Sequence, residues 1–352
     1  MNMKRYFKDA RADLLTYAGV IIAFLVISTL KSNGMLNRSQ SGLLVPICCY
    51  IVMAVSLNLT VGILGDLSLG HAGFMSVGAF SGVVTAMSLM NVIPSAPLRL
   101  ALAMVVGALC AAIVGFLVGI PVLRLNGDYL AIVTLAFGEI IRNVLNCLYF
   151  SLDGKRLIVS FNNPNIPGTI LVNGPAGATV SDKIATFPMG FALIIFTLIV
   201  VMNLINSRSG RAIMATRDNR IAAEAMGINV TKYKMMAFVT AAVLAGMAGA
   251  LYGLNFSTVA ASKFKFDTSI LVLVFVVLGG IGNIWGSIIA ATLLTVLPEL
   301  LRTFADYRML VYAIVLILVM LVTNNPMLRS LFSRIGRRGS RDAQTQVGGA
   351  DE

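Results

Sequence analysis

The sequence predicts an all-α integral membrane protein, a polytopic bundle of about 8–10 helical spans that includes broken or re-entrant helices. Of the 352 residues, 58% are hydrophobic and 12% are charged, whereas soluble domains average about 45–50% apolar and about 25% charged residues. A helix needs about 20 mainly apolar residues to cross a hydrocarbon core of about 30 Å, and backbone in lipid must satisfy its own hydrogen bonds. Uncharged apolar runs that suit such helices recur at 14–30, 42–65, 100–123, 187–207 and 235–262.

The basic residues predict how these spans are oriented. Segment 1–13 carries four Lys and Arg residues, segment 207–234 carries six and segment 326–352 carries five, together 15 of the 27 in the chain. Because Lys and Arg are enriched in cytoplasmic loops, we expect both termini and the 207–234 loop to lie in the cytoplasm. Topology and contact of the tail with anionic membrane lipid explain the net charge of +12 without any nucleic-acid partner.

The predicted organisation follows from these two signals. It consists of a cytoplasmic N-terminal segment 1–13, a transmembrane domain 14–325 with an extracytoplasmic loop 153–186 and a cytoplasmic loop 207–234, and a basic cytoplasmic tail 326–352. The outer loop is rich in Pro, Gly and Asn, and it follows a span predicted at 129–152.

Two uncharged stretches are too long for one straight crossing each. The stretch 67–98 begins with LSLGHAGF, and we expect a broken or re-entrant piece there before a span continues. The stretch 268–298 is interrupted by GGIGNIWG, which predicts a pair of shortened helices. Paired interruptions in the two halves of a transporter often mark its binding site, although the two segments share no residue-level repeat.

The first interruption also holds His71, the only histidine of the chain. Glycines in spanning helices commonly serve close packing, and a lone His commonly makes a structural hydrogen bond. The alternative is a discontinuous helix that lines a path for a solute. The candidate path residues are Ser68, Gly70, His71, Gly73, Phe74, Gly280, Gly282 and Asn283.

Two further features concern charge and metal chemistry. Glu139 and Arg142 lie three residues apart within a predicted span, so they share one helical face. Intramembrane charges usually pair inside a bundle, and a structural ion pair is a simpler explanation than a proton relay. The four cysteines lack metal-ligand spacing, so we expect no metal site and no disulfide framework.

The cytoplasmic loop is predicted to contain a short helix at 219–226. Asp218 is a suitable N-cap and Gly227 suits the position that ends a helix. A solvated connector is the simplest interpretation, but a small-faced helix would also fit a groove in a partner protein. The residues of this candidate coupling surface are Arg217, Asp218, Arg220, Ile221, Ala222, Glu224, Ala225 and Gly227.

Several absences limit the function. The chain contains no G-x-x-x-x-G-K-[ST] phosphate loop, so it is not expected to bind or hydrolyse ATP itself. It also offers no plausible nucleophile–base pair. We therefore expect a transport subunit without a cofactor of its own, and not an enzyme.

Five segments together resemble the LivM-type permease of branched-chain amino acid ABC importers, from about residue 43 to 302. They are SLGHAGFMSVGAF, GDYLAIVTLAFGEIIR, GRAIMATRDNRIAAEAMGIN, AGMAGALYG and VLGGIGNIWGSIIAATLLTVLPELLR. The resemblance implies a bacterial or archaeal cytoplasmic (inner) membrane protein that imports branched-chain or related amino acids. It also implies partners: a second, homologous permease, two ATPase subunits that bind ATP, and an extracytoplasmic solute-binding protein. Region 218–227 would be the coupling helix.

One departure leaves the solute open. Many relatives carry a Gly-rich stretch after the fifth span, where this chain reads SFNNPNIPG. Related permeases serve urea, amides and other small polar solutes, so these remain alternatives to amino acids. An ion-coupled secondary transporter is the rival from another class, with only Glu139 and His71 to support it; a channel or an intramembrane enzyme is more distant.

Overall fold

The computed structural model describes residues 19–31, 33, 37–90, 92–125, 127–153, 156–161 and 167–301, together with 310, 311, 313, 314 and 317. The predicted segments 1–13 and 326–352 and most of the last predicted span, 309–325, lie outside the described residues. The chain divides into two compact units, Met1–Leu293 and Leu294–Glu352.

Helices make up most of the described chain. In order they are Gly19–Lys31, α2 (Arg38–Asn58), the π-helix η1 (Leu59–Leu64), α3 (His71–Ser88), α4 (Ala96–Val122), α5 (Asp128–Asn146), α6 (Phe187–Asn206), α7 (Arg208–Asp218), α8 (Arg220–Ala225), α9 (Val230–Gly253), α10 (Phe266–Gly279) and α11 (Ile284–Leu300), with short 3₁₀ turns at Gly174–Ala176 and Ala261–Phe264. Within the described ranges, four helices are long and apolar enough to cross a membrane: Gln40–Leu64, α4, α6 and α9. The helical membrane fold is thus confirmed.

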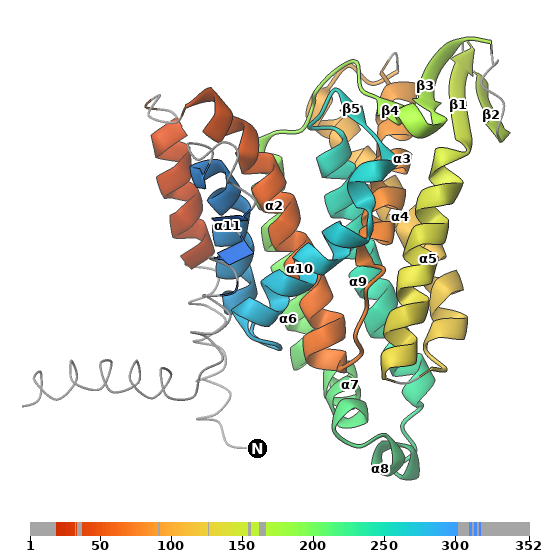
Figure 1. The fold of residues 1–352 in the computed structure, drawn as a ribbon, viewed down its shortest axis with the longest axis vertical. Coiled ribbons are helices and arrows are strands. Elements are labelled where there is room, and N and C mark those ends of the chain that lie inside the picture. Colours follow the sequence, from red (N-terminus) through yellow and green to blue (C-terminus); the bar gives the residue numbers. More distant parts are fainter. Residues whose placement is uncertain are drawn as a thin grey trace, which may run out of the picture. The chain divides into compact units, whose positions relative to one another are not determined.

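Helix α9 forms the centre of the first unit, where it packs against α2, α3 and α4 (Figure 1). Small residues make these contacts close. A Cβ atom added at Gly246 would lie 2.7 Å from the Gly107 carbonyl oxygen of α4, and one at Gly253 would lie 3.1 Å from the Ala79 carbonyl oxygen of α3. Helices in lipid associate through such van der Waals packing. The glycines of α9 therefore act as packing residues.

Both predicted interruptions are present. Residues 65–70 form no helix, and α3 begins only at His71. In the second half, α10 has 14 residues and α11 has 17, with a turn between them. Tyr50 of α2 and Phe275 of α10 hold the neighbouring helices together by an edge-to-face contact, with ring centroids 6.0 Å apart.

A small antiparallel sheet, which was not predicted from the sequence, involves loop 153–186, the residues just before it and a short segment after α9. Its strands are β1 (Leu148–Asp153), β2 (Arg156–Phe161), β3 (Thr169–Asn173), β4 (Ala178–Thr179) and β5 (Thr258–Val259), in the order β2-β1-β3-β4-β5. Asp182, which follows β4, pairs with the buried Arg99 of α4 at 2.5 Å. This ion pair attaches the sheet region to the helical bundle.

The predicted span 129–152 is too long at its C-terminal end. Helix α5 ends at Asn146, and the chain enters strand β1 at Leu148. The sequence LYFSLD is apolar enough to continue a span, but it carries the aromatic residues that favour a strand. Pairing with both β2 and β3 satisfies its backbone without a helix.

The sheet and the loop helices lie at opposite ends of the first unit. In Figure 1, β1, β2 and β3 lie at the top, and α7 and α8 lie at the bottom. Helix α6 leads from the sheet region to α7, and α9 returns from α8 toward β5. Loops 153–186 and 207–234 are therefore separated by the length of the bundle, as opposite membrane faces require. Which end faces the cytoplasm stays a prediction.

Candidate functional site

Helix α2 does not end as an α-helix but widens into the π-helix η1. All six residues of η1 are buried, and the turn ends at Gly65, whose φ of 84° is left-handed. The Asp66 N–H then donates to the Thr60 carbonyl at 3.1 Å. Single π-helical turns inside α-helices occur frequently at functional sites. The first interruption therefore begins at η1, before the segment that the sequence singled out.

His71, the first residue of α3, is buried and bonded to α2. Its Nε2 lies 2.8 Å from the Ser56 hydroxyl, which also donates to the Met53 carbonyl at 3.0 Å. A hydroxyl has one proton, so a Ser56 that donates to Met53 accepts from the His71 Nε2–H. The side chain of His71 also makes an edge-to-face contact with Phe74. The interpretation of His71 as a structural residue is thus supported by its hydrogen bond with Ser56.

Hydroxyl groups hold the non-helical segment before α3. Thr134 of α5 accepts from the Leu69 N–H at 3.0 Å, and Ser269 of α10 accepts from the Ala72 N–H at 3.1 Å. Gly70 packs directly on the Thr134 carbonyl, where a Cβ would overlap it. The hydroxyl of Ser68 is buried and makes no hydrogen bond within the described part of the chain. Residues 69–72 are thus bonded to α5 and α10, and the neighbouring Ser68 buries a hydroxyl group without a partner among the described residues.

The second interruption has two glycines in conformations that side chains rarely adopt. Gly280 has φ 92° and Gly282 has φ 82°. Asn283 caps the following helix through its Oδ1, which accepts from the Gly286 N–H at 3.3 Å. The Gly279 and Gly286 backbones lie so close that neither position has room for a Cβ. The turn between α10 and α11 is thus fixed by close backbone packing.

Asn58, at the end of α2, joins the two interruptions. Its Oδ1 accepts from the Gly282 N–H at 2.8 Å, and its Nδ2 donates to Ser287 Oγ at 3.0 Å. Gly62 of η1 lies against the same turn, since a Cβ there would overlap Asn58 Oδ1 and the Gly282 backbone. The second interruption therefore meets η1, and these contacts do not involve the segment from Ser68 to Phe74.

Asn58, Gly62 and the charged pair of Asp66 and Lys234 were not predicted from the sequence. Lys234 Nζ contacts both Asp66 carboxylate oxygens, at 2.7 and 2.9 Å, and the two side chains are only 8% and 14% exposed. A signal existed, because Asn58 and Asp66 are polar residues at the end of an apolar run. Their partners, however, lie more than 150 residues away in sequence.

The predicted loop helix exists as α8, with a different N-cap. Asn219 Oδ1 accepts from the Ala222 N–H at 3.0 Å, while Asp218 is the last residue of α7, so the prediction that Asp218 caps the helix is wrong. Gly227 ends α8 with φ 78°, and the Ile228 N–H donates to the Ala223 carbonyl at 3.0 Å. This is the pattern of a Schellman C-cap.

The exposed face of α8 is available to a partner. Ile221 and the following Met226 are 80% and 82% exposed, whereas Ala223 is buried against the rest of the loop. Ala222 and Ala225 are exposed small residues on this helix, and Arg220 pairs with Glu224 at 3.0 Å. Arg217 points elsewhere: its Nη1 donates to the Gly62 carbonyl at 2.6 Å.

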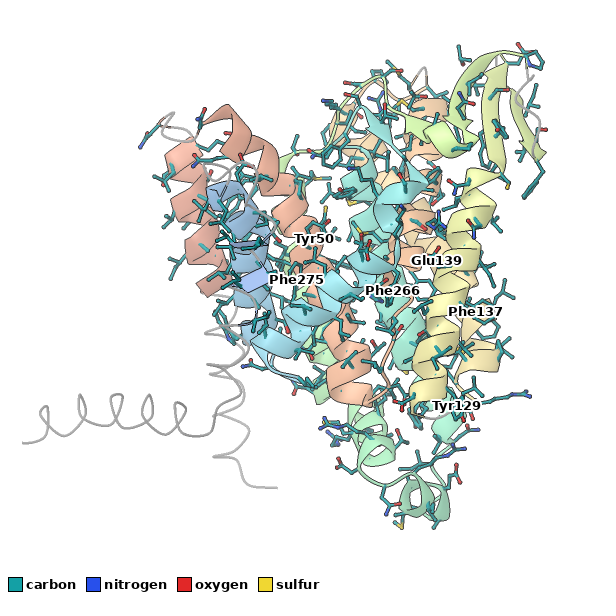
Figure 2. All side chains as sticks on the ribbon, in the orientation of Figure 1. Tyr50, Tyr129, Phe137, Glu139, Phe266 and Phe275 are labelled. Carbon is teal, nitrogen blue, oxygen red and sulfur yellow. The ribbon has the colours of Figure 1, made fainter. Side chains whose placement is uncertain are left out.

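Glu139 and Arg142 form an ion pair at 2.7 Å on α5. The second carboxylate oxygen of Glu139 accepts from the Phe266 N–H at 3.3 Å, and Figure 2 shows Glu139 facing the start of α10. A carboxylate at a helix N-terminus is stabilised by the unpaired N–H groups there. The pair therefore fixes α10 against α5. No cluster of metal-ligating side chains occurs among the residues that the structure describes.

A helical bundle with two interruptions in contact, and a loop helix exposed at one end, is consistent with a membrane transport protein. The chain belongs to the family described as branched-chain amino acid transport system permease components, and the model of this family matches residues 40–320. It is therefore a membrane-embedded transport protein of the ABC-transporter class.

Curated relatives are consistent with this family. The chain is 32% identical to the high-affinity branched-chain amino acid transport system permease protein LivM of Salmonella typhimurium over 319 residues, and to that of Escherichia coli K12 over 335 residues; each match covers 86% of this chain and 72% of the relative. It is 28% identical to the ribose import permease protein RbsC of Escherichia coli K12 over 91% of this chain and 97% of that protein. No solved structure matches the chain.

Proposed function

We propose that this chain is the membrane-spanning permease subunit of an ABC importer that translocates branched-chain or related amino acids. The observation that carries the proposal is the 32% identity to LivM over 86% of the chain. An extracytoplasmic binding protein would deliver the solute, and two separate ATPase subunits would supply the energy. A second, homologous permease would complete the membrane domain; the 27% identity to the branched-chain permease protein LivH over 78% of this chain supports such a pair.

The solute class rests on the family and not on a specific pocket. The similarity to RbsC means that related permeases carry a chemically different solute. Urea, amides or another small polar solute therefore form the second candidate. The buried hydroxyls of Ser68 and Thr134 near the α3 start would suit any such solute, and we place the path along this segment and the turn Gly280–Asn283.

Coupling is assigned to α8. Its exposed residues Ile221, Ala222 and Ala225 would occupy a groove in the ATPase, with the Arg220–Glu224 pair at the rim. The capped ends of this six-residue helix support that role, because a partner can push on a helix only if the helix keeps its shape.

The proposal is tested by purifying the tagged chain in mild detergent and identifying its partners by mass spectrometry. The assembled complex in proteoliposomes should accumulate leucine only with ATP and the binding protein, and parallel assays with urea and ribose decide the solute class. Accumulation by the lone chain under a proton or sodium gradient would contradict the proposal and favour an ion-coupled transporter.

A further inference from the structure

The carbonyl of Gly62 lies near the C-terminal end of η1, where the helix provides no further backbone N–H donors. The last carbonyls of a helix lack partners within it and need donors from elsewhere. Because η1 ends at Leu64 and the chain turns at Gly65, the Gly62 carbonyl is one of these groups. Arg217 of α7 supplies the donor at 2.6 Å, and its side-chain carbons pack on Gly65, where a Cβ would lie 2.8 Å from Arg217 Cγ.

A second contact attaches the same short segment to the other side of the loop. Lys234, in the first turns of α9, contacts both carboxylate oxygens of Asp66. Helix α8 lies in the chain between α7 and α9. Both flanks of α8 are therefore bonded to residues 62–66, one through a carbonyl and one through a carboxylate. We call the contacts Arg217–Gly62 and Lys234–Asp66 the clasp.

The clasped segment touches the second interruption directly. Gly62 leaves no room for a Cβ against Gly282, and Asn58 bonds both Gly282 and Ser287. A displacement of η1 toward the turn between α10 and α11 would therefore move this turn or break the two hydrogen bonds of Asn58. Close-packed interiors switch between discrete arrangements and do not deform continuously.

The π-helical form of η1 offers such a second arrangement. A π-turn holds one residue more than an α-turn of the same helix, and it can revert to α-helix only by shifting the following residues along the chain. In this chain, the residues that would shift are Gly65 and Asp66, and the clasp holds both the Gly62 carbonyl and the Asp66 carboxylate in place.

We propose that Arg217 and Lys234 are positioning residues that transmit the movement of α8 to η1 and, through Gly62 and Asn58, to the turn Gly280–Asn283. The inference rests on the proposed function of α8 as the coupling helix. In this role Arg217 acts inside the permease and not in the ATPase groove. The clasp links the loop to both interruptions without passing through the segment Ser68–Phe74.

The test is the number of solute molecules taken up per ATP hydrolysed by the assembled complex in proteoliposomes. Arg217→Gln should lower this ratio by about tenfold, the factor that corresponds to about 1.4 kcal/mol in an equilibrium, with the ATPase still co-purifying. Arg217→Lys, which restores a charged donor, should recover part of the ratio. Arg211→Gln is the matched control, because Arg211 lies on the same helix and donates to the Asn206 carbonyl of its own segment; it should behave as wild type.

The outcomes separate the possibilities. A wild-type ratio in Arg217→Gln overturns the inference and leaves the proposed function standing, and loss of the ATPase from this variant shows that Arg217 is a docking residue. If Arg217→Gln does not insert into the membrane, Lys234→Gln and Lys234→Arg test the inference instead. Uptake per ATP should fall in Lys234→Gln and stay at the wild-type value in Lys234→Arg. A wild-type complex without ATP-dependent uptake contradicts the proposed function itself.

Discussion

The contact between Gly62 and Gly282 makes a sharp prediction about stability. Gly62→Ala places a methyl group where Asn58 Oδ1 and the Gly282 backbone now lie. Overpacking costs about 1–3 kcal/mol, and an Asn58 amide that loses its buried partner costs about 1–3 kcal/mol more. The helix propensity of Ala over Gly returns about 1 kcal/mol. The net destabilisation should therefore be about 1–5 kcal/mol.

The control for this variant is Gly42→Ala. Gly42 lies in α2, the helix that continues into η1, but a Cβ there has no atom within 4 Å, so only the propensity term applies. Thermal unfolding of the two purified variants in the same detergent should show Gly62→Ala below wild type and Gly42→Ala at or above it. If Gly62→Ala unfolds at the temperature of Gly42→Ala, the close approach of the two interruptions is refuted.

Three further predictions concern the loop and the topology. Ala225→Trp should release the ATPase or lower uptake per ATP by about tenfold, because overpacking a fitted contact costs about 1–3 kcal/mol; wild-type assembly and uptake would show that α8 is only a connector. Gly227→Val should act similarly through strain at φ 78°, about 1–2 kcal/mol, whereas Gly227→Asn, which tolerates this conformation, should not. In a cysteine-free background, an impermeant thiol reagent added outside cells should label Cys at Thr169 of β3 and spare Cys at Ser209 of α7; the opposite pattern would invert the topology.

The parts of the fold that depend on length and composition could be predicted from the sequence. Runs such as 100–123 and 235–262 became α4 and α9, because an uncharged apolar segment of that length has few other stable forms in lipid. The two interruptions were also predictable, because clustered glycines destabilise a helix. In the second interruption, Gly280 and Gly282 adopt φ values that other residues avoid. These are local properties of the chain.

The errors have physical reasons. The sheet was missed because 148–152 is apolar enough to read as the end of a span and 153–186 was interpreted as a loop. One of the pairing partners, Thr258–Val259, is also distant in sequence. Asp218 was predicted as the N-cap and Asn219 as the first helical residue, although both are good capping residues. Asn219 has the extended backbone that an N-cap needs, with φ −154° and ψ 106°, whereas Asp218 continues α7.

The candidate site shows the same difference between local properties, which the sequence predicts, and contacts between distant residues, which it does not. For Gly70 and Gly73 the sequence left open close packing or a place along a solute path, and both pack closely on α5, against Thr134 and Gly138. Asn58 was not singled out, because a polar residue at the end of an apolar run does not by itself identify its partner. Its meaning comes from Gly282, which lies 224 positions further along the chain. Contacts of this kind cannot be read from spacing within one segment.

The arrangement of these contacts bears on how one fold can carry different solutes. Arg217 bonds to Gly62 of η1, and Lys234 bonds to Asp66 just after η1. These contacts do not include the segment Ser68–Phe74, where we place the solute path. Energy transmission and solute choice would then depend on different residues. A change at Ser68 should alter which solutes are carried while uptake per ATP of the best solute is kept, and a change in the clasp should lower that ratio for every solute alike. Parallel uptake assays with leucine, urea and ribose on Ser68→Ala and Arg217→Gln measure both effects, and a clasp variant that changes the order of solute preference would contradict this separation.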